Sequence, residues 1–569
     1  MQADVVVVGS GGGALTAAIT AAKAGARVIV LEKSEFVGGT TAMSGGVAWL
    51  PNNPYLQREG KDDPDKAMRY LKAVTGPFAK EEFLRTYIET APRLVEFLEQ
   101  NTHMKFCDAG FPDYKSRLDG GLDAGGRSLG SVPFDGKQLG SDFKRVRPQL
   151  KGSFVLLGRM SIDSSDVPHI YNQLHSFQSF RHVAKMVVSY GWDLLRGYGR
   201  DTRMTLGRAL IGRLFKSARE LGVEFLTSTP ATRLLVEGDR VVGVVAQSGG
   251  KEIEIRVTRG VVLASGGFSH NAEMLRQFVP HADVHETVLP EGNRGDGLQM
   301  GMAAGAHMGS GNFHNVLGTQ VTRMQRPDGK FERSLNLGLD RAKPGIILVN
   351  RQGLRFTNEG APYNDLTYAM NQTGNVETWY IMDIRSLRKY GAGLIRPGPT
   401  WLRPLGRFIR SGYLKTGATI EELAQKVGID PAGLRMTVAR MNDFARTGVD
   451  LDFHKGETPY EIWSGDITHA PNPGLGPIET APFCAIAMHP GNLGTFCGLV
   501  TNTDAQVLNT ESQPIEGLYA CGLDMHHPFS GTYPGGGSSI GPGMTFGYRA
   551  GLHVTSSHNS VGANLAKVD

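Results

Sequence analysis

The stretch ADVVVVGSGGGALTAAITAAKAGARVIVLEK, residues 3–33, decides the fold of this chain. Its run of valines is typical of a strand buried in a parallel sheet. Residues 9–14, GSGGGA, fit the pattern G-x-G-x-x-G/A, and an alanine-rich helix is expected over 14–24 before a second strand. Glu32 ends that strand 23 residues after Gly9, where a carboxylate can accept hydrogen bonds from ribose hydroxyls. The stretch therefore predicts a Rossmann-like nucleotide-binding fold, with a pyrophosphate at the helix N-terminus.

The composition is that of an ordinary globular protein with an excess of glycine. Of 569 residues 75 are glycine, while 40% of the chain is hydrophobic and 20% charged, so two or more domains can form. The net charge of +5, without a basic block interleaved with aromatics, predicts no nucleic-acid partner. The four cysteines form no CxxC pair, and we find neither a signal peptide nor an apolar run of about 18 residues. We therefore expect a cytoplasmic protein.

The loops that follow Glu32 distinguish FAD from NAD as the cofactor. Residues 37–41, VGGTT, and 44–46, SGG, would let backbone pass close to a second, flat part of the cofactor. This pattern resembles the FAD-binding fold of the fumarate reductase/succinate dehydrogenase superfamily. GVVLASGGFSHN (260–271) and GLYACGLD (517–524) resemble two later segments of that fold. An NAD enzyme with incidental glycine turns is the alternative.

The resemblance implies an α/β fold in which a Rossmann-like FAD-binding domain is split in sequence. Its two parts are expected at residues 1–270 and 477–569, and an inserted α+β catalytic or cap domain at 271–476. Within that insertion a single helix is expected over Ile420 to Ala445. Residues 40–46 contain no histidine, so the FAD is expected to be bound non-covalently.

The residues expected to bind FAD lie in the turns and loops that resemble the superfamily. They are Gly9, Gly11, Gly12, Ala14, Glu32, Lys33, Gly39, Thr40, Thr41, Ser44, Gly45, Gly46, Ala264, Gly266, Gly522, Asp524, Ser539 and Ile540. No metal site is expected, because the adjacent pair His526–His527 has no third ligand at a fitting spacing.

The charge pattern near the end of the chain argues against a dicarboxylate substrate. Ala481 through Tyr548 contains neither arginine nor lysine, and a dicarboxylate needs buried cations. An uncharged, glycine-lined site with tyrosines suits a neutral, apolar substrate that carries one weakly basic oxygen, such as a ketone.

Three further motifs resemble the 3-ketosteroid Δ1-dehydrogenase family. They are GFPDYKSRLDGGLDAGGRSLGSVPFD (110–135), NEGAPYND (358–365) and GTYPGGGSSIGPGMTFGYRA (531–550). The resemblance covers most of the chain. The sequence differs from the family pattern at Leu523, where asparagine is common, and at Phe496–Cys497, where small residues are common.

The resemblance assigns roles to five residues. Tyr533 and the backbone N–H of Gly537 would hydrogen-bond the ketone oxygen, and Tyr363 would remove the α-proton. Tyr114 would support Tyr363 or relay its proton, and Phe111 would pack against the substrate. The β-carbon would give its hydride to flavin N5.

The sequence thus predicts an FAD-dependent dehydrogenase that forms a C=C bond next to a cyclic ketone, with a 3-ketosteroid and its 1,2 position as the leading substrate. The electron acceptor would be external and is not identified by any motif. A cyclohexanone-type ketone dehydrogenase, a flavin-dependent ene- or fumarate-type reductase and a non-catalytic flavin or ligand carrier are the alternatives.

The segment 169–204 contains apolar residues at helical spacing together with positive charge. The apolar residues are Phe180, Val183, Val187, Tyr190 and Leu194, and the basic ones Arg181, His182, Lys185, Arg196, Arg200 and Arg203. A basic amphipathic helix can lie on a membrane surface, from which an apolar substrate could be drawn. A helix packed on its own protein is the other interpretation.

Overall fold

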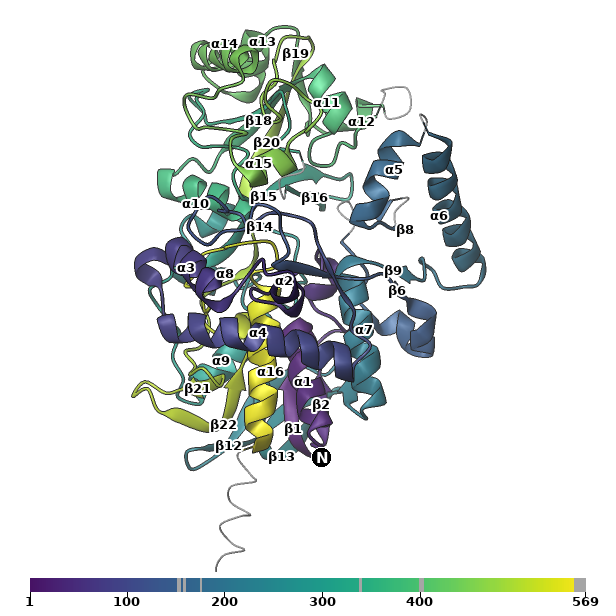
Figure 1. Ribbon diagram of the computed structural model, residues 1–569, viewed down its shortest axis with the longest axis vertical. Coiled ribbons are helices and arrows are strands. Elements are labelled where there is room, and N and C mark those ends of the chain that lie inside the picture. The colour runs from purple at the N-terminus through teal and green to yellow at the C-terminus, as the bar shows by residue number, and fades with distance from the viewer. Residues whose placement is uncertain (151–154, 157–159, 174–175, 337–339, 399–403, 557–569) are drawn as a thin grey trace, which may run out of the picture.

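The computed structural model describes residues 1–150, 155–156, 160–173, 176–336, 340–398 and 404–556. Two β-sheets organise these residues, one above the other along the long axis of Figure 1. The N-terminal strand lies in the lower sheet, and strands from the middle of the chain form the upper one.

The first sheet has the order β10-β2-β1-β13-β12-β22-β21, and β11 pairs with β12. Its strands are β1 (Gln2–Val8), β2 (Val28–Leu31), β10 (Glu224–Leu226), β11 (Ala231–Glu237), β12 (Arg240–Ser248), β13 (Lys251–Leu263), β21 (Gln506–Leu508) and β22 (Pro514–Ala520). β1 is parallel to both β2 and β13, and Val8 pairs with Leu31 and Leu263. Because parallel strands end at one edge, the glycine turn, Glu32 and Ala264 all follow strands at that edge.

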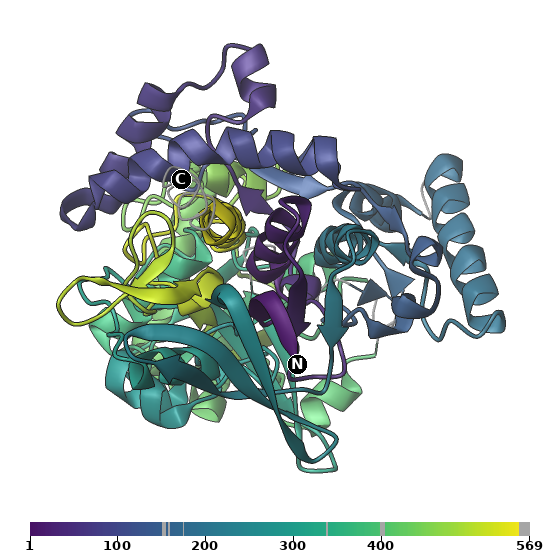
Figure 2. The same ribbon diagram turned by 90° about the horizontal axis from the view of Figure 1, so that it is seen from below.

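Three helices pack close to this sheet: α1 (Gly12–Lys23), α7 (Leu206–Glu220) and α16 (Ile540–Ser556). The helix expected over 14–24 is therefore confirmed, with its start two residues earlier. α1 and α16 lie side by side in both views (Figures 1 and 2). A Cβ on Gly13 would lie only 2.6 Å from the carbonyl oxygen of Gly543. The glycines at this crossing thus let the first and last parts of the chain approach closely.

The second sheet has the order β16-β15-β20-β18-β17, with β14 and β19 also paired to β20. Its strands are β14 (Glu286–Thr287), β15 (Val316–Gln325), β16 (Phe331–Asn336), β17 (Ile346–Val349), β18 (Thr378–Asp383), β19 (Lys415–Gly417) and β20 (Phe483–Thr495). β20 lies beyond residue 476, where the return to the FAD-binding domain was expected, yet it is the central strand here. The division at residues 270 and 476 stays a prediction, and sheet membership favours a second boundary after Thr495.

Helices α10 (Tyr363–Thr373), α13 (Ile420–Val427) and α14 (Pro431–Thr447) accompany the second sheet. The prediction of one helix over Ile420 to Ala445 is wrong, because the segment breaks after Val427. Gly428 has a left-handed φ of 73°, and Asp430 accepts hydrogen bonds from the N–H groups of Ala432 and Gly433 at the start of α14. A glycine C-cap followed by an Asp-Pro start ends one helix and begins another.

The remaining helices and strands are short or peripheral. The helices are α2 (Pro54–Arg58), α3 (Pro64–Thr75), α4 (Glu81–Asn101), α5 (Val167–Asn172), α6 (Phe177–Leu195), α8 (Ala272–Phe278), α9 (Asp296–Ala303), α11 (Ile384–Tyr390), α12 (Gly406–Arg410) and α15 (Pro459–Ser464). The strands are β3 (Ala48–Trp49), β4 (Phe106–Asp108), β5 (Ser128–Ser131), β6 (Phe134–Asp135), β7 (Val155–Leu156), β8 (Met160–Ser161) and β9 (Arg203–Met204). None of the helices in the described ranges has the length and hydropathy needed to cross a membrane.

Candidate active site

One cavity of about 730 Å³ is lined by residues that accompany both sheets. It brings together nearly all the residues expected at the site. These are Gly9, Gly11, Gly12, Ala14, Glu32, Lys33, Gly39, Thr40, Thr41, Ser44, Gly45, Gly46, Phe111, Tyr114, Ala264, Gly266, Tyr363, Gly522, Tyr533, Gly537, Ser539 and Ile540. Segments more than 500 residues apart in sequence therefore share one wall.

The nucleotide end of the cavity is built around the turn between β1 and α1. The backbone N–H of Gly12 donates to the Thr41 hydroxyl at 3.1 Å. Glu32 accepts from the Ser10 hydroxyl and, at 2.8 Å, from the N–H of Ser34. These bonds hold the carboxylate at the end of β2, where it could accept hydrogen bonds from a ribose. The N-terminus of α1 offers N–H groups to phosphates.

The charged residues of the cavity lining lie at this same end. Lys33 pairs with Asp296 at 2.7 Å, and Arg147 donates to the Ser34 hydroxyl at 2.7 Å. Neither histidine nor cysteine lines the cavity in the described ranges, which fits a cofactor held without a covalent bond. The residues present therefore fit FAD.

Asp524 is not among the residues that line the cavity, and its expected contact with FAD stays a prediction. Its carboxylate accepts hydrogen bonds from the N–H groups of Ser265 (2.5 Å) and Gly267 (3.0 Å). Burial raises the pKa of this carboxyl, and the two N–H donors oppose that rise. Asp524 thus braces the loop after β13, and this loop, through Ala264 and Gly266, forms part of the wall.

Three tyrosines converge at the other end of the cavity, and all are buried. The hydroxyls of Tyr114 and Tyr363 are 3.4 Å apart. The Tyr533 ring centroid lies 5.8 Å from that of Tyr114 and 5.7 Å from that of Tyr363. Each comes from a different part of the chain: a loop between β4 and β5, the first residue of α10, and the glycine-rich loop before α16.

Burial is the main electrostatic effect at this cluster. It raises the pKa of Tyr114 and of Tyr363 well above 10, and the neighbouring phenols add to the rise at Tyr363. The pKa of Tyr533 is also raised by burial, but hydrogen bonds involving Tyr363, Ser539 and the N–H of Gly537 oppose the shift. Tyr533 therefore carries its proton at neutral pH and can donate it to an oxygen in the cavity.

The loop with Tyr114 is fixed to the glycine-rich loop by backbone and buried charge. The N–H of Tyr114 donates to the carbonyl of Pro534 at 2.9 Å, and the Tyr70 hydroxyl donates to the same oxygen at 2.6 Å. Asp113 accepts from Trp49 Nε1 at 2.8 Å and from the buried Arg127 at 2.7 Å. These contacts hold Tyr114 and Tyr533 in one rigid corner.

Close packing explains the glycines beside Tyr533. A Cβ on Gly536 would overlap the ring of Phe111, and Gly537 has a φ of 96°, which L side chains rarely adopt. The Phe111 ring in turn contacts Trp463 of α15, with centroids 5.3 Å apart. The predicted substrate-wall residue Phe111 thus lies between the glycine-rich loop and α15.

Sequence reasoning missed the contribution of α15. Tyr460 is buried, its ring centroid lies 4.6 Å from that of Tyr114, and both Tyr460 and Trp463 line the cavity. Burial raises the pKa of Tyr460, and the buried guanidinium of Arg341 opposes the rise. No motif in TPYEIW distinguishes this tyrosine from an ordinary packing residue, so only the fold reveals it. Leu317, Leu493 and Leu523 complete the apolar wall.

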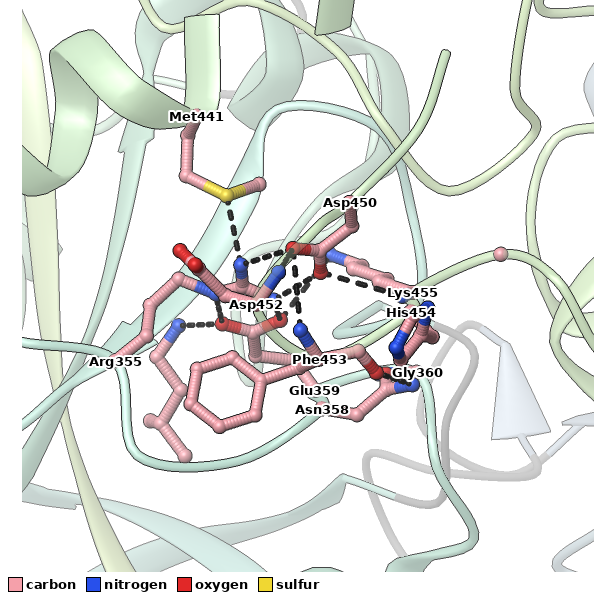
Figure 3. A network of polar contacts seen from close by, with 12 residues as sticks. Arg355, Asn358, Glu359, Gly360, Met441, Asp450, Asp452, Phe453, His454 and Lys455 are labelled. Atoms are coloured by element: carbon pink, nitrogen blue, oxygen red, sulfur yellow. Dashed lines mark hydrogen bonds and ion pairs between the residues drawn. The ribbon is translucent and has the colours of Figure 1, made fainter. Parts of the chain in front are cut away.

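A buried ionic network holds the segments that carry Tyr363 and Tyr460 (Figure 3). Arg355 contacts Glu359 at 2.7 and 2.8 Å and Asp450 at 2.8 and 3.1 Å. Lys455 lies 3.8 Å from Glu359 and donates to the Ile346 carbonyl at 2.7 Å. The network ties residues 355–359, four positions before Tyr363, to residues 450–455, five positions before Tyr460.

The comparisons with known proteins agree with this cavity. The FAD binding domain family matches residues 4–540. The 3-oxosteroid 1-dehydrogenase of Mycolicibacterium smegmatis is 37% identical over 97% of each chain. The 4-oxocyclohex-2-ene-1-carboxylate 5-dehydrogenase of Sinomonas cyclohexanicum is 36% identical over 97% of this chain and 93% of its own. The 3-ketosteroid delta1-dehydrogenase of Sterolibacterium denitrificans, solved with 1,4-androstadiene-3,17-dione, superposes with a TM-score of 0.89 at 34% identity, covering 98% of this chain and 100% of its own.

Fold and cavity therefore define an FAD-dependent oxidoreductase that acts on CH–CH bonds. The chain belongs to the FAD binding domain family, in the branch with the 3-oxosteroid 1-dehydrogenases. The cofactor expected from the glycine loops is thus confirmed, and the NAD alternative is wrong.

Proposed function

We propose that this enzyme desaturates a neutral cyclic ketone next to its carbonyl, and that a 3-ketosteroid, oxidised at its 1,2 position, is the substrate. The observation that carries the proposal is the convergence of Tyr114, Tyr363 and Tyr533 in one buried, uncharged end of an FAD cavity. The relatives include both steroid and monocyclic ketone dehydrogenases, and the lining of the cavity distinguishes the two substrate classes.

Tyr533 and the N–H of Gly537 would hold the ketone oxygen. Removing a proton next to a ketone builds negative charge on that oxygen, and a preorganised donor aimed at it is worth roughly 10²–10³ in rate. The Tyr533 hydroxyl keeps its proton because of burial, and Gly537 also lines the cavity. Phe111, on the wall beside Gly536, would pack against the substrate rings.

Tyr363 would take the α-proton, with Tyr114 as the group that receives or stabilises it. The 3.4 Å separation of the two hydroxyls allows a proton to pass between them. The buried Arg341 lowers the pKa of both Tyr114 and Tyr460 and would favour negative charge in the cluster, whereas Tyr460 itself raises the pKa of Tyr114. Bound FAD would supply the hydride acceptor, its N5. The reduced enzyme would then pass its electrons to an external acceptor.

The charge distribution favours a steroid over a keto acid. The charged lining residues of the described chain are at the nucleotide end, and the tyrosine end is lined by Phe111, Leu317, Leu493, Leu523 and Trp463 together with the tyrosines. None of these lining residues is a cation, so an oxocyclohexane carboxylate would find no direct ion-pair partner among them and would bear a substantial desolvation cost. A neutral polycyclic ketone meets no such penalty.

The test is anaerobic flavin reduction. The holoenzyme is mixed separately with a 3-keto-4-ene steroid, with cyclohexanone and with 4-oxocyclohexanecarboxylate, and bleaching of the oxidised flavin band is followed. We expect the steroid alone to bleach the flavin rapidly, with a 1,4-diene as the product. Rapid bleaching by a monocyclic ketone but not the steroid would contradict the substrate, and no bleaching by any ketone would contradict the reaction.

A further inference from the structure

The helical hairpin formed by α5 and α6 projects from the body of the molecule. In Figure 1 it lies to the right of the upper sheet, and in Figure 2 the long blue helix α6 is at the outer edge. It is the same segment in which the sequence indicates a basic amphipathic helix, apart from Leu174 and His175, which lie outside the described residues.

One face of α6 is a row of exposed apolar side chains. Phe177 is 80% exposed, Val188 72% and Leu195 81%, and Phe180 and Trp192 are also more than half exposed. Along the chain they are three, eight, four and three residues apart, which places them on one side of a helix. The exposed row is centred on residues 177, 188 and 195, so it is rotated from the stripe that the sequence predicts, in which Val183 and Tyr190 are only partly exposed.

The opposite face of α6 fixes the hairpin to the protein. Asp193 is buried and accepts from the N–H and hydroxyl of Thr202 at 2.8 and 2.9 Å. His182 contacts Asp166 at 2.8 Å. Because these polar contacts form the inner face, the apolar row points outward in the described part of the chain. Packing of α6 against its own protein therefore does not explain why this row is apolar.

Positive charge flanks this row on one side. Arg181 and Lys185 are exposed and, with His169, Gln178 and His182, line a surface pocket of about 410 Å³. Arg196 lies over the Trp192 ring, 5.1 Å from its centroid. Two expected cations do not contribute: Arg200 donates to the carbonyls of Phe143 and Val146, and Arg203 pairs with Asp166.

We propose that the outward face of α6 binds an anionic lipid bilayer, with Phe177, Val188 and Leu195 entering the interface. Arg181 and Lys185 would contact lipid phosphates, and Trp192 would lie at headgroup level, as aromatic rings do at membrane interfaces. An apolar stripe flanked by basic residues is the pattern of helices that lie in the plane of a membrane.

Charge distinguishes a bilayer from a second copy of this chain. In a two-fold pairing of the apolar rows, Arg181 and Lys185 of the two copies would flank the same interface, and like charges there repel. An anionic surface complements them instead. The proposal does not depend on the chemistry of the active site, so each can fail without the other.

The experiment is vesicle flotation of the holoenzyme. Vesicles of phosphatidylcholine alone are compared with phosphatidylcholine–phosphatidylglycerol vesicles, at low and high salt. We expect flotation with the anionic vesicles, weakened by salt because the surface charges are screened. The double variant Phe177→Ser, Leu195→Ser should lower the bound fraction at least tenfold. The double variant R181E, K185E should weaken binding by more than tenfold, since one basic residue at an anionic surface is worth about fivefold.

Matched controls keep the outcome clear. Ile467 is 81% exposed but lies outside the hairpin, so Ile467→Ser should float like the parent protein. Flavin absorbance and melting temperature, unchanged in every variant, show that the fold is intact. The proposal is overturned if the parent fails to float, if the hairpin variants float equally well, or if sedimentation shows a dimer that Phe177→Ser, Leu195→Ser abolishes.

Discussion

At the scale of single residues, the roles of Tyr363 and Tyr533 can be separated by pH. Burial keeps the pKa of Tyr363 far above 10, so its base form is scarce at neutral pH and grows about tenfold per pH unit. We expect the anaerobic rate of flavin reduction by the steroid to rise with pH in the parent enzyme. Tyr533→Phe should lower that rate roughly 10²–10³-fold and keep the rise, whereas Tyr363→Phe should lose both rate and pH dependence.

The control for these variants is Tyr368→Phe, on the same helix as Tyr363. The Tyr368 ring stacks on Phe313 with centroids 4.1 Å apart, and it is not part of the cavity lining. Its rate should stay within twofold of the parent enzyme. A Tyr363→Phe variant that kept the parent rate would rule out the phenol as base.

Which site residues the sequence could predict depends on whether a local pattern marks them. Tyr114, Tyr363 and Tyr533 stand in recognisable motifs, and the structure brings them together. Tyr460 stands in none and reaches the cavity only because α15 packs beside Tyr114. Asp524 follows a recognisable strand, yet it turns toward the N–H groups of residues 265 and 267. The direction of a side chain behind a loop is set by tertiary packing, which a motif does not encode.

At the scale of elements, the ionic network around Arg355 is expected to carry much of the local stability. Arg355 is 4% exposed, and Glu359 and Asp450 are fully buried. Arg355→Met leaves two buried carboxylates without their guanidinium, and breaking such a pair costs about 3–5 kcal/mol. Denaturant unfolding followed by flavin fluorescence should show this loss. The flavin-reduction rate should fall too, because the segment before Tyr363 loses its anchor.

The matched control is Arg440→Met on α14, which removes a solvent-accessible ion pair with Asp452. Water screens an exposed ion pair, which therefore contributes little to stability, so this variant should unfold almost like the parent protein. If both variants lost the same free energy of unfolding, the buried Arg355 network would contribute no more to stability than an exposed ion pair.

Helices and strands could be predicted where every residue of the segment favours the same conformation, and not where the hydrophobic periodicity and the cap residues disagree. The strand, turn and helix of residues 3–33 agree with expectation to within two residues at the start of the helix, because glycine, alanine and valine each favour their observed conformation. The prediction of a single helix over 420–445 was wrong because the hydrophobic periodicity continues across Gly428 and Pro431. The glycine C-cap and the Asp-Pro start nevertheless end one helix and begin another there.

At the scale of the whole molecule, the sequence indicates two units but not where the chain crosses between them. β20 pairs with four strands of the second sheet although it follows the expected boundary at residue 476. Its pairing is long-range, and no composition change marks it. Because of this arrangement, the cavity is lined by residues of both sheets: Leu493 of β20 and Gly9, which follows β1, line the same space.

Acid is expected to loosen the molecule through three buried histidines near the glycine-rich loop. Burial lowers the pKa to about 4 at His314 and His527 and to about 3 at His526, and His527 Nε2 contacts the Ser538 carbonyl at 2.9 Å. An unfolded histidine titrates near pH 6.5, so between pH 6.5 and 4 the unfolded state binds more protons. Stability conferred by these groups is thus complete above pH 6.5 and falls as the pH is lowered, by up to about 2 kcal/mol per histidine at pH 5.

Buried carboxyls with raised pKa, such as Asp113 and Asp365, act in the opposite direction, so the histidine contribution must be isolated by a variant. His314→Gln cannot titrate, and its free energy of unfolding should decline less than that of the parent protein between pH 7.5 and pH 5. The difference in this decline should approach 2 kcal/mol by denaturant titration, because pH 5 lies about 1.5 pH units below the pKa of an unfolded histidine. His454→Gln, at a position 68% exposed, should decline like the parent. Identical declines in the parent and His314→Gln would show that His314 takes up its proton without opening the fold.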